Sequence, residues 1–268
     1  MRIPYILPMI LVASSANADI SDIIKEFQTA DIIILGEVHD NPYHHAIQAE
    51  ITAAIQPSAL VFEMFSPEQA AIINALRWEG AGIGSLEEDL EWAKSGWPSF
   101  DFYAQIIKAD PEGVVFGGSA PIETVREAVT EGAAKMFGEG AEIYGLDQSL
   151  PPDQQSAREA NQMEAHCNAL PSTMLSGMVE AQRLRDITLA DRALRALDEV
   201  GAPIIIIAGN GHARDDWGIP AALLIADPNV RVMTLGQLEA EPEGAQPFTH
   251  ILVSDPVDRP DPCLDFRG

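Results

Sequence analysis

The alternation of short β-branched runs with helical segments constrains the fold of this chain more than any other feature. The runs are rich in Ile, Val, Leu and Phe and short enough to be buried strands. They lie at residues 31–35, 59–65, 113–116, 203–208, 230–235 and 249–253. Helical spacing fills most of the intervals, for example residues 42–55, 67–76 and 122–131. Strands that alternate with helices form a mostly parallel central sheet flanked by helices. The sequence therefore predicts an α/β fold.

Two segments are longer than a connection between neighbouring strands requires. Residues 78–109 hold three of the four tryptophans and predict a helical insertion near one end of the sheet. Residues 151–199 predict two long helices broken near Pro171. The 268 residues, 47% of them hydrophobic, supply enough core for one domain. We expect a single α/β domain over residues 19–268, with a proline-rich tail at the surface.

The first 18 residues have the features of a secretory signal peptide. Arg2 precedes an apolar stretch, and Ala16-Asn17-Ala18 forms a small-x-small cleavage pattern. We expect a mature chain that begins near Asp19 and is periplasmic or secreted, without a cysteine at the cleavage position for lipid attachment. Cys167 and Cys263 could pair in an oxidising compartment, and the sequence leaves that pairing open.

The chain is strongly acidic. It has 41 Asp and Glu against 16 Lys and Arg, a formal charge of −25. Such an excess repels phosphate backbones and anionic lipid surfaces, so we expect neither nucleic acid nor a membrane surface as a partner. The acidic residues are spread in ones and twos, which is typical of a solvated surface.

A Gly-x-x-His unit follows two of the predicted strands. "DIIILGEVH" delivers His39, and "IIIIAGNGH" delivers His212. Because the carboxyl ends of parallel strands meet at one edge of a sheet, both histidines are expected at one cleft. The glycines permit close approach of the backbone to a ligand. Glu37 and Glu63 lie at the ends of strands too, and a carboxylate in an apolar run needs a partner.

A helix is expected to begin directly after the first unit, with Asn41 as its cap and Pro42 in its first turn. Tyr43, His44 and His45 fall in that turn and are candidate ligands for a metal or haem iron. The amide donors of a helix start disfavour protonation of nearby imidazoles, and neutral imidazole is the form that binds metal.

The segment "AQRLRDITLA" places polar side chains on one side of a predicted helix. They are Gln182, Arg185 and Asp186, with Leu189 beside them. This pattern fits either a surface ion-pair network or buried polar groups that orient the histidines, and the sequence leaves both open. Asp147 is a weaker candidate of the same kind, whereas His166 and His250 are expected to be structural.

The sequence resembles the ChaN-like haem-binding uptake proteins of the Tiki superfamily. The resemblance rests on "GEVHDNPYHH", "VFEMF", "GWPSFDFY", "AQRLRDITLA" and "AGNGHARDDWGIP", in this order, over nearly the whole mature chain. It implies an α/β fold, export beyond the inner membrane and a role in haem or iron uptake. It also implies a homodimer that sandwiches haem under the tryptophan-rich insertion, and outer-membrane haem-uptake machinery as a partner. Prototype members of the family are anchored lipoproteins. This sequence departs from them because its expected cleavage position has no cysteine for a lipid.

The resemblance implies two competing mechanisms. In the first, the cleft binds haem, with His39, Tyr43, His44, His45 or His212 as the axial ligand. Arg185 and Arg214 are then the candidate partners of the propionates.

In the second mechanism the protein is a metal-dependent esterase or peptidase. His39 and His212, with Glu37 or Glu63, would hold zinc or manganese and activate a water. A metal-free variant would use one histidine as general base, oriented by a glutamate. A serine nucleophile elbow and a His-Glu-x-x-His helix are both absent from the sequence. We therefore predict haem binding first, hydrolysis second and a structural protein with a vestigial site third.

Overall fold

The computed structural model describes residues 19–78, 85–261, 263 and 264. Its centre is a six-stranded sheet with the order β3-β2-β4-β1-β5-β6, and every strand pair in it is parallel. The strands are β1 (Ile32–Glu37), β2 (Ala59–Phe62), β3 (Val114–Gly117), β4 (Ile204–Gly209), β5 (Val232–Leu238) and β6 (His250–Val253). All six expected strands and the α/β fold are confirmed, although β2 ends three residues earlier than its apolar run.

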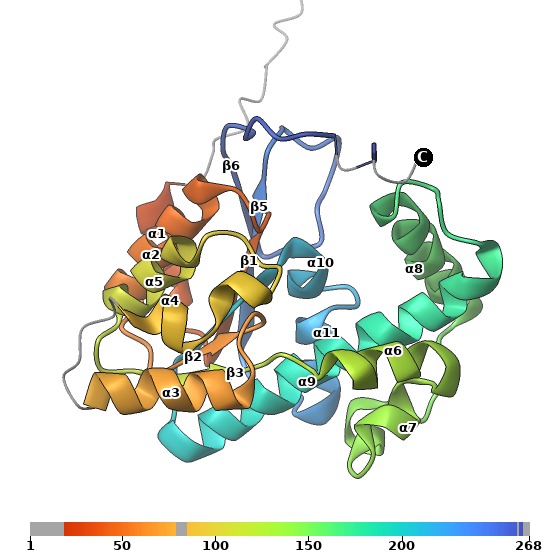
Figure 1. The fold of residues 1–268 in the computed structure, drawn as a ribbon, viewed down its shortest axis with the longest axis horizontal. Helices are drawn as coiled ribbons and strands as arrows, with labels where there is room; N and C mark the ends of the chain where they lie inside the picture. The colour runs from red at the N-terminus through yellow and green to blue at the C-terminus, as the bar shows by residue number, and fades with distance from the viewer. Residues whose placement is uncertain (1–18, 79–84, 262, 265–268) are drawn as a thin grey trace, which may run out of the picture.

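Helices cover both faces of the sheet (Figure 1). Successive strand residues point to opposite faces, so continuous apolar runs make both faces apolar and both need a cover. Ile33 and Leu35 of β1 pack with one layer, and Ile32 and Ile34 pack with the other. The first layer contains α1 (Ile20–Phe27), α2 (Pro42–Ile55), α3 (Pro67–Trp78), α4 (Leu86–Asp89), η2 (Trp92–Lys94) and α5 (Phe100–Ala109). The second contains α6 (Ile122–Glu131), α7 (Ala133–Phe137), η3 (Ala141–Tyr144), α9 (Leu175–Val200) and α11 (Ile219–Ala226). Burial on both sides explains why β1, up to Glu37 at its end, and β4 are apolar.

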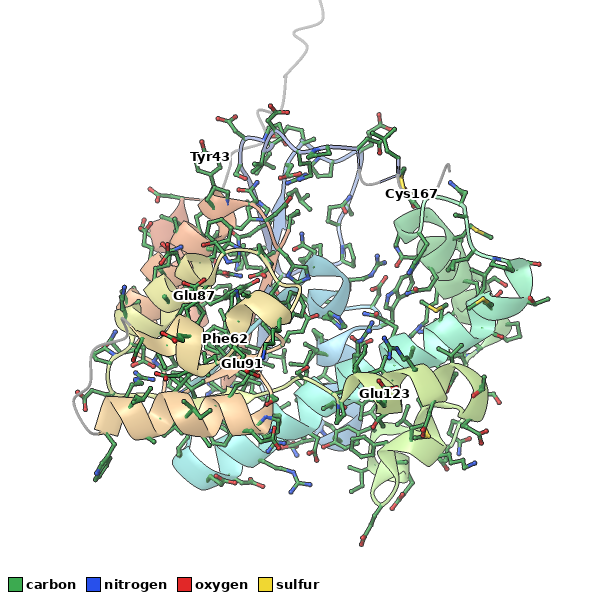
Figure 2. The ribbon with its side chains drawn as sticks, in the orientation of Figure 1. Tyr43, Phe62, Glu87, Glu91, Glu123 and Cys167 are labelled. Carbon is green, nitrogen blue, oxygen red and sulfur yellow. A yellow bond between two sulfur atoms is a disulfide. The ribbon has the colours of Figure 1, made fainter. Side chains whose placement is uncertain are left out.

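Helices α8 (Pro152–Ala165) and α9 are the two expected long helices, joined through η4 (Ser172–Met174) next to Pro171. Figure 1 shows α8 standing beyond the second helical layer, with the segment after β6 crossing towards it. A disulfide joins Cys167, just after α8, to Cys263 in that segment, with an S–S distance of 1.99 Å (Figure 2). The pairing that the sequence left open is therefore present.

The region expected to be a helical insertion contains α4, η2 and α5 in its described part. Residues 79–84 of it, and the whole signal peptide expected at residues 1–18, lie outside the described residues. Within the described ranges, no helix combines the length and the apolar character needed to cross a bilayer.

Candidate functional site

The two Gly-x-x-His units lie side by side at the carboxyl edge of the sheet. Strands β1 and β4 are neighbours, and Glu37 is paired in register with Gly209. The chain then turns into α2 after β1 and into the short helix α10 (Asn210–Ala213), which carries His212, after β4. A Cβ atom on residue 209 would lie 2.9 Å from Nε2 of His39. Glycine at this position therefore lets the His39 ring approach the backbone of β4.

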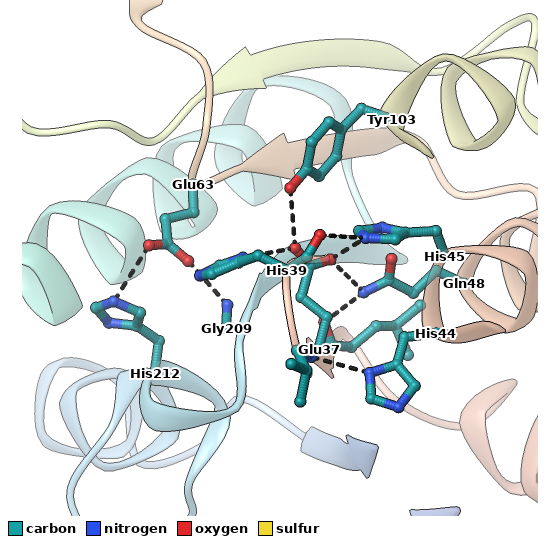
Figure 3. A network of polar contacts seen from close by, with 12 residues as sticks. Glu37, His39, His44, His45, Gln48, Glu63, Tyr103, Gly209 and His212 are labelled. Atoms are coloured by element: carbon teal, nitrogen blue, oxygen red, sulfur yellow. Dashed lines mark hydrogen bonds and ion pairs between the residues drawn. The ribbon is translucent and has the colours of Figure 1, made fainter. Parts of the chain in front are cut away.

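A buried carboxylate orients the His39 ring. Glu37 is inaccessible to solvent, and its Oε1 lies 2.7 Å from Nδ1 of His39. The hydroxyl of Tyr103 donates to the same oxygen at 3.2 Å, and the Gln48 amide donates to Oε2 at 2.8 Å (Figure 3). These donors compensate the cost of a buried carboxylate and fix its position. Burial and the Glu37 carboxylate together raise the pKa of Tyr103, so this phenol stays a hydrogen-bond donor.

The next two histidines support this arrangement from the interior. His45 donates from Nε2 to the backbone carbonyl of His39 at 2.8 Å, and its Nδ1 lies 3.4 Å from Oε2 of Glu37. His44 accepts a hydrogen bond from the backbone N–H of Val38 at Nδ1, over 2.9 Å. Burial lowers the pKa of His44 to about 4, so its ring is neutral. Both rings are fully buried and organise the turn that presents His39.

His212 lies between two carboxylates. Its Nδ1 donates to Oδ1 of Asp186 at 2.6 Å, and its Nε2 is 3.3 Å from Oε1 of Glu63. The other oxygen of Glu63 accepts the backbone N–H of Gly209 at 2.8 Å. Burial alone would disfavour the charged imidazole, but the two carboxylates outweigh it and raise the pKa of His212 to about 10. The histidine is therefore a fixed cation at neutral pH.

His39, held by Glu37, and His212, held by Asp186, both approach Glu63. Figure 3 shows the tip of the His39 ring pointing towards the Glu63 carboxylate, on the side opposite Glu37. Burial would raise the pKa of Glu63, yet the charges of His212 and His39 and the Gly209 hydrogen bond lower it to about 2. Burial opposes charge on His39 too, and the Glu37 hydrogen bond and the Glu63 charge raise its pKa above the ordinary value. The result is an alternating row of carboxylates and imidazoles.

Part of this row lines a large cleft of about 1390 Å³. His39, Glu63 and His212 line it, and the His39 side chain is 35% exposed. Apolar side chains form much of its remaining wall: Met64, Ile72, Leu90, Trp97, Ile122, Val125 and Leu189. Trp97 contacts the His39 ring edge to face, with centroids 4.9 Å apart. The cleft thus combines an oriented imidazole with an apolar surface large enough for a planar ligand.

Two arginines of α9 add positive charge to this cleft. Arg185 and Arg192 lie seven residues apart, on the same side of the helix, and both line the cleft. Nε of Arg192 is buried without a hydrogen-bond partner in the described part of the chain. A guanidinium with unused donors is suited to an anionic group of a ligand.

The match to a family model identifies the protein class. The family described as "haem-binding uptake, Tiki superfamily, ChaN" matches residues 23–223, which include every residue of the row described above. The chain belongs to the ChaN family. The family implied by the sequence motifs is therefore confirmed, and the match spans the sheet edge, the cleft and α9.

Solved structures agree with the fold of this ChaN family member. One, described as cofacial heme binding to ChaN of Campylobacter jejuni, is 19% identical, with a TM-score of 0.63 over 83% of this chain and 87% of that chain. Another, the type III effector HopBA1, is 12% identical, with a TM-score of 0.50 over 88% of this chain and 93% of that chain. At these identities the likeness concerns the fold alone. The search of curated proteins found no match.

The structure brings together part of the predicted site. Glu37, His39, Glu63 and His212 meet at the sheet edge, and Arg185 lines the same cleft. Four other candidates lie elsewhere. His44 and His45 are buried, Tyr43 is 52% exposed and does not line the cleft, and Arg214 pairs with Asp216 at 2.7 Å.

For α9, the buried polar arrangement is the one observed. Asp186 is buried and bonds His212, and the Gln182 amide lies 3.0 Å from the same ring. The alternative mechanism requires a metal ion as cofactor, and this requirement gains no support. In the described ranges, no group of three or more His, Cys, Asp or Glu side chains is arranged to hold a metal ion.

Sequence reasoning missed several residues of the site. Gln48 and Tyr103 hold Glu37. Gln48 lies outside every motif, and Tyr103 ends "GWPSFDFY" without a polar partner in the sequence that would assign it a role. For Arg192 the sequence did contain a signal. It follows Arg185 by seven residues, a spacing that places both side chains on the same face of a helix.

Proposed function

We propose that the cleft binds haem and that the protein serves in haem or iron uptake outside the inner membrane. One observation carries the proposal: the partly exposed His39 imidazole lines the largely apolar cleft of about 1390 Å³. Glu37 holds Nδ1 of this ring. Membership of a haem-binding uptake family supports it. Haem is the cargo of such a protein, because uptake requires that it be bound and passed on.

The residues present fit an iron-porphyrin. A neutral imidazole nitrogen is a common axial ligand of haem iron, and the second ring nitrogen is usually held by a hydrogen bond, as Glu37 holds that of His39. Apolar walls that include Trp97 and Leu189 suit the porphyrin faces. Arg185 and Arg192 would receive the propionates. Tyr43, on the surface outside the cleft, remains a second proposed iron ligand for haem bound between two copies.

Export is part of the same proposal. We infer that residues 1–18 are removed and that the mature protein is periplasmic or secreted. The Cys167–Cys263 disulfide supports this, because such bonds persist in oxidising compartments. Homodimerisation around haem and contact with outer-membrane uptake machinery are further proposals. Mass spectrometry of the exported protein should give an N-terminus near Asp19, and light scattering with and without hemin tests the dimer.

Hemin titration of the mature, haem-free protein tests the site. We expect a shifted Soret band that saturates at a fixed stoichiometry in the wild type. His39→Ala should weaken binding by at least tenfold, while His250→Ala, a histidine variant outside the cleft, should match the wild type. If Tyr43→Phe abolishes the shift and His39→Ala does not, haem binds at the surface and the cleft assignment fails. An unchanged free-hemin spectrum at micromolar protein would refute haem binding altogether.

A second candidate function is hydrolysis of an ester or peptide without a metal. The observation that favours it is the geometry of His39. Its Nδ1 is held by Glu37, its ring tip is directed towards Glu63, and both side chains line the cleft. His39 would take a proton from water while the water oxygen adds to the carbonyl carbon, then return that proton to the leaving group. The His212 cation would stabilise the negative charge that develops nearby.

Turnover of p-nitrophenyl esters in the presence of EDTA tests this candidate. We expect a loss of at least 100-fold in His39→Ala, the size typical for removal of a general base. Turnover that is equal in the wild type and His39→Ala would eliminate the candidate.

A further inference from the structure

A second, smaller pocket lies between α8 and α9 and shares His212 with the large cleft proposed for haem, called the haem cleft below. Its volume is about 320 Å³. Arg158 and His166 contribute from α8 and its C-terminal end, and Arg185 contributes from α9. His212 and Trp217 complete the polar and aromatic wall. Only His212 and Arg185 also line the haem cleft.

The lining of this pocket has the opposite charge from the chain as a whole. It contains two arginines and two histidines, and no Asp or Glu is among its described lining residues. The chain itself carries 41 acidic residues against 16 basic ones. A pocket free of carboxylates in so acidic a protein creates a local region that attracts anions.

The guanidinium groups of the pocket have unused hydrogen-bonding capacity. Within the described residues no ion pair joins Arg158 or Arg185 to a carboxylate, and Nε of Arg158 is buried without an acceptor. Neighbouring arginines on α9 behave differently, because Arg183 pairs with Glu180 and Arg195 pairs with Asp191. A buried guanidinium donor without an acceptor costs free energy that a bound oxyanion would recover.

Two carboxylates act on Arg158 without a hydrogen bond to it. Asp186 and Asp216 act on Arg158 through their charge. Asp186 accepts the Nδ1–H of His212, and Asp216 forms the ion pair with Arg214. The carboxylates therefore offset part of the charge of Arg158 without filling its donor sites.

An aromatic side chain borders the arginines. The guanidinium carbon of Arg214 lies 3.7 Å from the centroid of the Trp217 ring, and that of Arg158 lies 5.6 Å from it. These contacts hold the indole in place beside the Arg158 donors. The pocket thus offers a fixed planar wall as well as cations.

We propose that this pocket binds the carboxylate or phosphate group of a small organic anion. Planar guanidinium groups bind such oxyanions through paired hydrogen bonds, and the Asn161, Gln162 and Gln182 amides supply further donors. The volume of about 320 Å³ is at the small end of the range for ligand sites and suits a ligand of metabolite size. The proposal requires neither haem nor His39, so it stands independently of the proposed function.

Isothermal titration of mature, haem-free protein with sodium phosphate and, separately, with sodium citrate tests the site. We expect saturable binding of at least one probe. The probe with the higher affinity shows whether the site prefers a phosphate or a carboxylate group. Arg158→Gln should weaken that binding at least tenfold. The same variant should bind hemin like the wild type, because Arg158 does not line the haem cleft.

Arg195→Gln is the matched control, because it removes the same charge from an exposed position on α9 outside the pocket. It should leave anion binding unchanged. Circular dichroism verifies folding, and Arg185→Gln serves as a second variant if Arg158→Gln is unfolded. The proposal is wrong if neither probe binds saturably at 10 mM, if Arg195→Gln weakens binding as much as Arg158→Gln, or if the Arg158→Gln, Arg185→Gln double variant retains wild-type affinity.

Discussion

The buried cation at His212 predicts that stability falls as the pH is raised above neutrality. The folded protein holds the pKa of this imidazole at about 10, against an ordinary value of 6.5. The stabilisation is therefore complete below pH 6.5 and is lost as the pH rises through 10. One pKa unit corresponds to about 1.4 kcal/mol, so the contribution is up to about 5 kcal/mol. Urea unfolding of the disulfide-intact mature protein at several pH values between 6 and 10 measures it.

Two variants isolate this contribution from other titrating groups. His212→Gln removes the imidazole, so its free energy of unfolding should change less with pH than that of the wild type. Asp186→Asn removes the carboxylate 2.6 Å from Nδ1 but leaves Glu63, and it should show an intermediate slope. If the wild type and His212→Gln lose stability in parallel from pH 6.5 to 10, His212 is not a buried cation and the assigned electrostatics are wrong.

Three further outcomes follow from the same contacts. Gly209→Ala should weaken hemin binding several-fold, because its Cβ would lie 2.9 Å from Nε2 of His39; hemin titration measures this, and unchanged affinity would place haem elsewhere. Glu37→Gln should lower the pKa of His39 in haem-free protein, as read from the NMR shifts of the ring, since it removes the charged acceptor at 2.7 Å. Replacing Cys167 and Cys263 by serine should lower the free energy of unfolding by about 2–4 kcal/mol, because the disulfide closes a loop over a sequence separation of 96; equal stability would contradict this.

The fold and the meeting of the two strand-end histidines at one cleft could be predicted from the sequence because both depend on local patterns. Continuous apolar runs such as residues 204–208 mark strands buried on both faces. The carboxyl ends of parallel strands share one edge of the sheet, so two strand-end histidines had to be neighbours once β1 and β4 were adjacent. Neither inference requires knowledge of side-chain packing.

The roles of individual side chains could not be predicted, because they depend on how distant elements pack. Tyr43, His44 and His45 are consecutive, yet the start of α2 turns the first to solvent and the other two into the core. Tyr103 reaches Glu37 from α5, 66 positions away, through a contact that no sequence spacing encodes. The buried Nε donor of Arg158 is likewise recognisable only once its neighbours are known.

The two functions proposed for the cleft make incompatible use of one nitrogen. Nδ1 of His39 is occupied by Glu37, so Nε2 is the atom available either to bind iron or to accept a proton. Hemin bound there should therefore abolish any esterase activity at the stoichiometry that saturates the Soret change. Esterase activity that persists in hemin-saturated protein would separate the two sites. Haem would then have to bind through another donor, such as the exposed Tyr43, and the cleft would belong to hydrolysis.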